Sequence, residues 1–448
     1  MAASRKTPPD LLDTLIQHWP DALSGQCRLE LALSGGMDSV VLLDLLCRWR
    51  DERGGPAFSA LHVHHGLSAQ ADDWVRACED WCRARQVPLR VERVAVQAGG
   101  GDSLEAEARK VRYQAFAGGG AEVIALAHHA DDQSETVLLQ VLRGGGPRAL
   151  AAMPLLREHQ GQQLWRPLLK VGRTTLAAYA AARQLQWVED DSNADTDHFL
   201  RNFLRHEVMG RLRQRTPALD KQLARLAQRM ADAAEMVDAL AAMDLAQVQR
   251  GRELDLPALL ALSDARQRHV VLAWLAQLGL SLPSPESLHS WLAQVRSAAA
   301  ATQPLLEYQS LVLLRYRQRL LALPRVAPQP WPLCCAVGET LRLPHGELSW
   351  RRAPGGLPDD WHGRLLDVLP RTGGEKLPLK VGRKPVKTVF QEAGVPPQLR
   401  LDWPLLEDDA GELLAVPSLG VSVLHATAGE GWWPQWLPLA IVSRPVND

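Results

Sequence analysis

The segment Ser34–Ser39, Ser-Gly-Gly-Met-Asp-Ser, combines glycines, hydroxyls and a carboxylate that could hold a phosphorylated ligand. The apolar run before it predicts a buried strand, and the apolar run after it predicts a helix. Glycines allow close approach of the backbone, and the first N–H groups of a helix point at an anion. Asp38 would repel bare phosphate, which indicates a bridging Mg²⁺. The lysine of a Walker A loop is missing, so the segment predicts a different phosphate loop.

A second polar segment, His128–Thr136, follows the predicted strand 122–126 and therefore reaches the same edge of the sheet. Two histidines and three carboxylates crowded there could hold a metal, bind a cationic substrate or shift one another's pKa. Helix capping by Asp131 or Asp132 is the simpler interpretation. An HD-type phosphohydrolase is a further alternative, but that class is mostly helical and leaves the phosphate loop unexplained.

Basic and histidine-rich segments supply other candidates. Arg109 and Arg112 lie on adjacent faces of a predicted helix, where they either grip phosphate or are simply solvated. A basic run from Arg201 and Arg205 to Arg215 suits a phosphate backbone. Three histidines in the segment 62–65 could bind a metal, but a structural or nucleotide-lining role is the stronger interpretation.

Composition limits the class of protein. A chain of 448 residues predicts two or three domains, and 46% hydrophobic with 23% charged residues is ordinary for a globular protein. The net charge of −1 gives no indication of a nucleic-acid partner, so such a partner would have to bind local basic patches. No apolar run is long enough to span a membrane, and we expect a cytoplasmic protein. The cysteines form no CxxC pair, which disfavours zinc-ribbon and iron–sulfur sites.

Strand and helix patterns alternate through the first half of the chain, which predicts an α/β fold with a doubly wound parallel sheet. Strands are expected at 29–33, 58–64, 89–96 and 122–126, with helices at 71–85 and 103–116 between them. The phosphate loop then lies at the carboxyl end of the first strand, where such sheets bind ligands.

The pattern changes after Pro217. The stretch 218–249 is almost free of glycine and proline, and further helices are predicted at 265–278 and 285–300. Prolines between 324 and 332 mark a linker, and the tail predicts a small α+β domain. The predicted domains are 1–215, a helical domain 216–325, a linker 326–340 and a C-terminal domain 341–448.

At this point the motifs can be taken together. SGGMDS, HVHHGL, ARKVRY, AHHADDQSET, RPLL and EDDSNADTDHFLRNFLR stand in one order and at one spacing. In this arrangement they resemble the bacterial tRNA(Ile)-lysidine synthetases, which are N-type ATP pyrophosphatases with a PP-loop. The resemblance is strongest over 25–215, and the tail motif KPVKTVFQEAGVPP resembles the long form of that family.

The resemblance implies an adenine nucleotide alpha hydrolase-like fold and a two-step reaction. The C2 carbonyl oxygen of the wobble cytidine in a CAU-anticodon tRNA(Ile) attacks the α-phosphate of ATP and releases pyrophosphate. The ε-amine of free L-lysine then displaces AMP and leaves lysidine. ATP, Mg²⁺, tRNA(Ile) and lysine are therefore the expected ligands; no membrane partner is expected, and a homodimer is left open.

The resemblance also implies roles for individual residues. Asp38 would hold Mg²⁺, and Arg112 the α-phosphate, with Arg109 and Arg201 as further candidates for that role. His128 or His129 would position the adenylate. Asp132 and Glu135 would hold the lysine ammonium. The ATP-binding residues would be Ser34, Gly35, Gly36, Met37, Asp38 and Ser39, and those that bind tRNA would be Arg201, Arg205, Lys384 and Lys387.

Three rival functions remain at this level. A tRNA thiolase with the same loop typically uses paired cysteines, which this chain lacks. An amidating synthetase would carry an N-terminal glutaminase domain. A non-catalytic tRNA-binding protein is disfavoured because SGGMDS and HHADDQSET are intact.

Overall fold

The computed structural model describes residues 10–438, with gaps at 22, 24–26, 67, 69, 96–103, 190–199, 281, 300–301, 309–310 and 325–331. The chain forms two compact units, Met1–Met236 and Val237–Asp448, and each is described by itself. Of the helices in the described residues, none has the length and apolar character needed to cross a bilayer.

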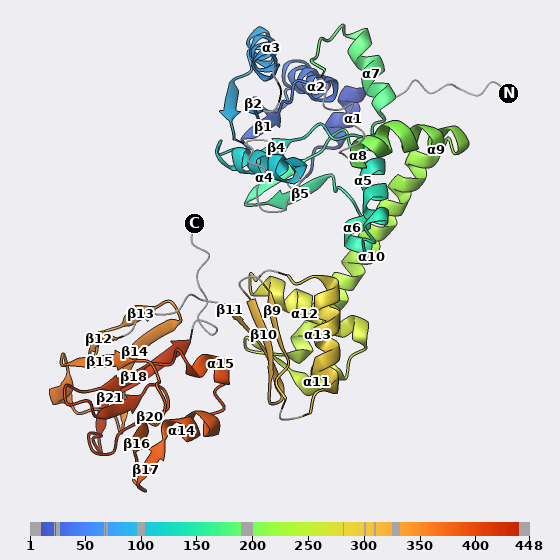
Figure 1. The fold of residues 1–448 in the computed structure, drawn as a ribbon. Coiled ribbons are helices and arrows are strands. Elements are labelled where there is room, and N and C mark those ends of the chain that lie inside the picture. Colours follow the sequence, from blue (N-terminus) through green and yellow to red (C-terminus); the bar gives the residue numbers. More distant parts are fainter. Residues whose placement is uncertain are drawn as a thin grey trace. The chain divides into compact units, whose positions relative to one another are not determined.

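The first unit is built on a six-stranded sheet with the order β3-β2-β1-β4-β6-β5. Figure 1 labels β1, β2, β4 and β5 of this sheet among the helices of the unit. Its strands are β1 (Leu29–Ala32), β2 (Phe58–His64), β3 (Leu89–Arg93), β4 (Val123–Ala125), β5 (Leu156–His159) and β6 (Gln162–Trp165). The pairings β1–β2, β1–β4, β2–β3 and β4–β6 are parallel, which confirms the predicted parallel sheet. The antiparallel hairpin β5–β6 at the edge was not predicted.

Helices cover both faces of this sheet, because alternate side chains of each strand point to opposite sides. Leu29, Leu31 and Leu33 pack on one side in a core that includes buried residues of α2 (Met37–Arg53). Ile124 packs on the other side with Phe116 of α4 (Leu104–Ala117). The remaining helices are α1 (Leu11–Gln17), α3 (Ala71–Ala84), α5 (Ala130–Leu142), α6 (Pro147–Leu150), α7 (Arg173–Ala182), α8 (Leu200–Phe203), the π-helical turn η2 (Leu204–Val208), α9 (Met209–Arg215) and the long α10 (Leu219–Val248).

The second unit begins with helices, as the sequence predicted, but it also holds a five-stranded sheet that the sequence analysis did not predict. Its elements are β7 (Gln249–Arg250), β8 (Glu253–Asp255), α11 (Leu256–Leu260), α12 (Asp264–Gln277), α13 (Pro285–Ser297), β9 (Leu305–Tyr308), β10 (Leu311–Tyr316) and β11 (Arg319–Pro324). Leu313 and Leu320 pack in the core with α12 and α13, whereas Leu314 and Leu321 belong to a second buried cluster. Strands apolar on both faces lack period-two alternation, so the pattern alone could not separate them from buried helix.

The rest of the second unit is rich in β-structure with two short helices, which agrees with the predicted α+β tail. Its strands are β12 (Leu333–Ala336), β13 (Leu341–Leu343), β14 (Gly346–Pro354), β15 (Leu365–Leu369), β16 (Lys376–Pro378), β17 (Arg383–Pro385), β18 (Leu405–Glu407), β19 (Leu413–Val416), β20 (Gly420–Val421) and β21 (Glu430–Pro438). The short helices are η3 (Asp359–Trp361), α14 (Val386–Glu392) and α15 (Pro397–Arg400). Together they enclose a separate apolar core around Phe390, Trp403 and Trp436.

Candidate active site

The loop between β1 and α2 has the form that the sequence predicted for a phosphate site. Gly35 adopts φ +93°, and a Cβ there would lie 2.8 Å from Cγ2 of Val188, so only glycine fits. The hydroxyl of Ser39 accepts a hydrogen bond from the Gly35 N–H at 3.2 Å and lies 3.1 Å from the Ser34 hydroxyl. Gly36 caps α2, whose first N–H groups are left to face an anion.

Asp38 lies in the first turn of α2 and meets the start of α5. Nε2 of His129 is 3.4 Å from Oδ2 of Asp38 and 3.5 Å from Oδ2 of Asp132. Burial disfavours the imidazolium, but Asp38, Asp132 and Asp131 together raise the pKa of His129. Oδ1 of Asp38 is buried and has no hydrogen-bond partner among the described residues. A buried carboxylate oxygen without a donor fits a cation, and Asp38 is therefore suited to hold Mg²⁺.

The acidic residues at the start of α5 do more than cap the helix. The N-cap is His129 rather than the expected Asp131 or Asp132, and its backbone N–H donates to Oδ2 of Asp132 at 3.1 Å. Capping therefore accounts for one oxygen of Asp132. Glu135 lies one turn further along, with only 3% of its side chain exposed, and needs a cation to remain charged.

Two arginines from α8 and η2 supply that cation. Arg205 donates from Nε and Nη2 to the two oxygens of Glu135, at 2.7 and 2.9 Å, and from Nη2 to Asp132 at 3.0 Å. Arg201 donates to Glu135 at 3.1 Å and to Asp132 at 3.4 Å. From the sequence, the two arginines were expected to bind tRNA, with Arg201 also a candidate for the α-phosphate, and the two carboxylates were expected to bind lysine. The structure joins all four residues in one network.

Arg213 extends this network at its other end. Its guanidinium pairs with Asp131 at 2.7 Å and with Asp220 of α10 at 2.9 Å. Arg213 was expected only as part of the basic run that ends at Arg215, since nothing local in the sequence indicates a partner so far away in the chain.

His128, which precedes His129 in the chain, has several cationic side chains near it. Burial, together with the charges on Arg166, Arg201 and Arg109, lowers the pKa of His128 to about 3, although Asp132 opposes the shift. His128 is therefore neutral at physiological pH. Arg166, in the RPLL motif, is 2% exposed and donates to the carbonyl of Pro154 at 2.8 Å, while its Nε lacks a partner among the described residues. The cations around His128, which are Arg109, Arg166 and Arg201, are suited to bind an anionic group.

Arg112 on α4 is exposed, and it lies close enough to His65 for its charge to act on that imidazole. Burial and the charge on Arg112 lower the pKa of His65 to about 4. Nδ1 of His62 lies 2.9 Å from the carbonyl oxygen of Leu33, which favours the structural interpretation of the histidine run. The acidic loop residues Asp190 to Asp195 lie outside the described residues.

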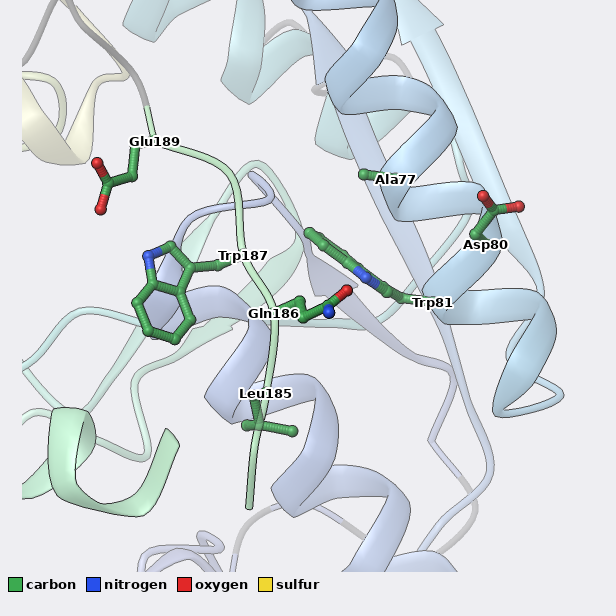
Figure 2. Close-up of a pocket in the computed structure, with 7 residues that line it drawn as sticks. All are labelled: Ala77, Asp80, Trp81, Leu185, Gln186, Trp187 and Glu189. Atoms are coloured by element: carbon green, nitrogen blue, oxygen red, sulfur yellow. The ribbon is translucent and has the colours of Figure 1, made fainter. Parts of the chain in front are cut away.

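An open pocket of about 700 Å³ lies beside the phosphate loop, but its chemistry differs from that of the loop. It is formed by α3 and by the segment 185–189, which passes Gly35 with the Val188 N–H donating to the Gly35 carbonyl at 3.0 Å. Figure 2 shows Trp81, Trp187, Asp80 and Glu189 around it. The described lining contains carboxylates and no cationic side chain, so it does not suit a triphosphate.

The predicted tRNA-binding lysines of the tail lie on β17 and α14. Nζ of Lys384 is 2.6 Å from Oε2 of Glu392, whereas Lys387 is exposed. Lys376, Lys380 and Arg383 lie on or next to the same β16–β17 hairpin. We refer to these five cations as the lysine patch.

Comparison with known proteins adds the family. Three family models match: a PP-loop domain over residues 11–212, a TilS substrate binding domain over 254–321 and a TilS substrate C-terminal domain over 366–436. The chain is 48% identical to a tRNA(Ile)-lysidine synthase of Chromobacterium violaceum, over 96% of this chain and 99% of the relative. It is 40% identical to the protein of that name in Pseudomonas aeruginosa, over 96% of both chains. A crystal structure of a TILS C-terminal domain aligns with 24% of this chain and 98% of its own, at 24% identity and a TM-score of 0.21.

Proposed function

Because the chain belongs to the tRNA(Ile)-lysidine synthase family, which uses ATP through its PP-loop, we propose that it joins free L-lysine to C2 of the wobble cytidine of CAU-anticodon tRNA(Ile). The observation that carries this proposal is the meeting of the phosphate loop with the Asp38–His129–Asp132 group at one sheet edge. An adenylating site and an acidic site for an amine are then neighbours.

In the first step, the C2 carbonyl oxygen of the cytidine attacks the α-phosphate of ATP, and pyrophosphate leaves. The Ser34–Ser39 loop would bind the departing pyrophosphate through its N–H and hydroxyl groups. A Mg²⁺ held by Asp38 would neutralise charge on the phosphates. Arg112 is assigned to the α-phosphate, and the neutral His128 positions the adenylate.

In the second step, a C–N bond forms between the lysine ε-amine and C2, and the C–O bond to AMP breaks. A free lysine amine has a pKa of ~10.4 and must lose a proton before it attacks. Asp132 and Glu135 would hold the ammonium and provide a carboxylate to accept that proton. AMP leaves with the former carbonyl oxygen, so the atoms balance.

Incorporation of radiolabelled lysine into a CAU-anticodon tRNA(Ile) transcript tests the whole proposal. We expect incorporation that requires ATP, with one pyrophosphate and one AMP released per lysine. A tRNA carrying a different wobble base is the control. Transfer of sulfur, or of ammonia in place of lysine, would assign the site to another PP-loop reaction.

A further inference from the structure

Every oxygen of the two carboxylates assigned to lysine already accepts a hydrogen bond from the protein. Both oxygens of Glu135 accept from Arg205, and one of them also accepts from Arg201. Oδ1 of Asp132 accepts from both arginines, and Oδ2 accepts from the backbone N–H of His129. An ammonium group entering this arrangement would find no oxygen of the pair without a donor.

Electrostatics opposes the addition of a third cation to this group. The Glu135 and Asp132 side chains are 3% and 13% exposed, so their charges require close cationic partners. Arg201 and Arg205 already balance the two negative charges of Asp132 and Glu135, so an added ammonium would place an uncompensated positive charge in this buried group. Binding of lysine at Glu135 therefore requires a guanidinium to move away.

The arginines have both the access and the chemistry to move. Their side chains are 26% and 32% exposed, far more than the carboxylates that they hold. Arg205 lies on the π-helical turn η2, a rare conformation that is frequent at functional sites. A guanidinium binds phosphate through paired hydrogen bonds, so a phosphate in the site offers Arg205 an alternative partner.

We infer that Arg205, with Arg201, fills the ammonium site of the lysine pocket in the free enzyme, and that L-lysine binds only after a phosphate of ATP or of tRNA has drawn these guanidinium groups away. The inference rests on the proposed placement of lysine at Asp132 and Glu135. It makes the two arginines an internal substitute for the substrate and couples the lysine site to the phosphate site.

Binding of radiolabelled lysine to the full-length wild-type protein tests this without any substitution. Equilibrium dialysis would compare the protein alone, with α,β-methylene-ATP, with tRNA(Ile), and with both. The methylene bridge prevents adenylation, so only binding is measured. We expect lysine affinity to rise by at least about tenfold in the arm that supplies the effective phosphate, which also identifies its source. Equal affinity in all four arms would overturn the inference.

Substitution of Arg205 tests the same idea from the other side. Arg205→Gln leaves Arg201 to neutralise the buried carboxylates, and we expect it to bind lysine without nucleotide or tRNA at least about tenfold more tightly than wild type. Arg183→Gln is the matched control, because Arg183 pairs with the buried Asp44, which lies outside this network. We expect its lysine affinity to remain at the wild-type value.

Glu135→Gln separates failure of the inference from failure of the proposed function. If it abolishes lysine binding in the complete complex while Arg205→Gln gains none in the free protein, lysine does bind at Glu135 and the arginine mechanism is wrong. If lysine affinity in the complete complex is unchanged by Glu135→Gln, the lysine site itself lies elsewhere.

Discussion

The α5 network and the lysine patch both gather positive charge, but they do so in opposite ways. At α5, guanidinium groups hold buried carboxylates through several directed hydrogen bonds each, so the geometry of each pair is well defined. In the patch, Lys387 is exposed, and Lys384 has a single partner, Glu392. Arginine suits fixed, forked geometry, whereas lysine acts as a mobile point charge. We therefore expect geometry-dependent chemistry in the first region, and we propose that the second attracts RNA through its charge.

Among the substitutions considered in the two regions, Asp38→Asn should give the largest effect on the reaction. It removes the carboxylate expected to hold Mg²⁺, which is worth several kcal/mol of charge stabilisation, so pyrophosphate release should fall at least about 100-fold. The measurement is pyrophosphate release with tRNA present. Asp51→Asn, also on α2 but paired only with Arg50 at the surface, is the matched control. Normal turnover of Asp38→Asn would remove Asp38 from the mechanism.

Glu135→Gln should raise the KM for lysine by about tenfold or more and the KM for ATP much less, because a charged hydrogen bond to the ammonium is lost. Breaking a buried ion pair can cost about 3–5 kcal/mol of stability, so melting curves must show that the variant is folded at the assay temperature. Glu52→Gln, which loses an exposed pair with Arg48, is the control. A rise in the KM for ATP alone would assign Glu135 to nucleotide or metal instead.

How far the sequence predicts this molecule depends on how local each signal is. The strands β1, β2 and β4 and the helices α3 and α4 lie within a residue or two of their expected bounds, because periodicity and glycine breaks are local. The sheet β7–β11 was not predicted, since β10 and β11 are apolar on both faces.

The site shows the same limit. The phosphate loop is contiguous in the chain, so its form could be predicted from six residues. The pairing of Glu135 with Arg205 joins residues 70 positions apart, and no local pattern reports it. Sequence reasoning therefore found all four residues of the network but assigned them as two unrelated sites.

The neighbours His128 and His129 provide a pH test inside the first region. The pKa of His129 is raised above its ordinary 6.5, so its stabilisation is complete below that pH and is lost as pH rises through the folded-state value. The pKa of His128 is lowered to about 3, so its contribution is present above pH 6.5 and is lost as pH falls toward 3.

Urea unfolding of His129→Asn and His128→Asn from pH 5 to pH 9 measures both effects. Relative to each variant, wild type should lose stability toward high pH in the first comparison and toward low pH in the second. The same sign in both comparisons would contradict the charge distribution described for α5.

The lysine patch should give the smallest effect, and one visible only in the salt dependence of tRNA binding. Each phosphate contact contributes a slope of about −0.7 to −0.9 in log K against log salt. Lys387→Ala should flatten the slope by about one such contact, and Lys384→Ala by less, because Lys384 must first leave Glu392. Glu392→Gln frees Lys384 and should therefore steepen the slope.

Arg342→Ala removes an exposed cation on β13 outside the patch and is the control for simple loss of charge. ATP turnover per bound tRNA should be unaffected in all four variants, since none touches the phosphate loop. Identical slopes for wild type, Lys387→Ala and Glu392→Gln would show that the patch does not contact tRNA. The two regions would then differ only in that the charges of the α5 network are buried and those of the patch are solvated.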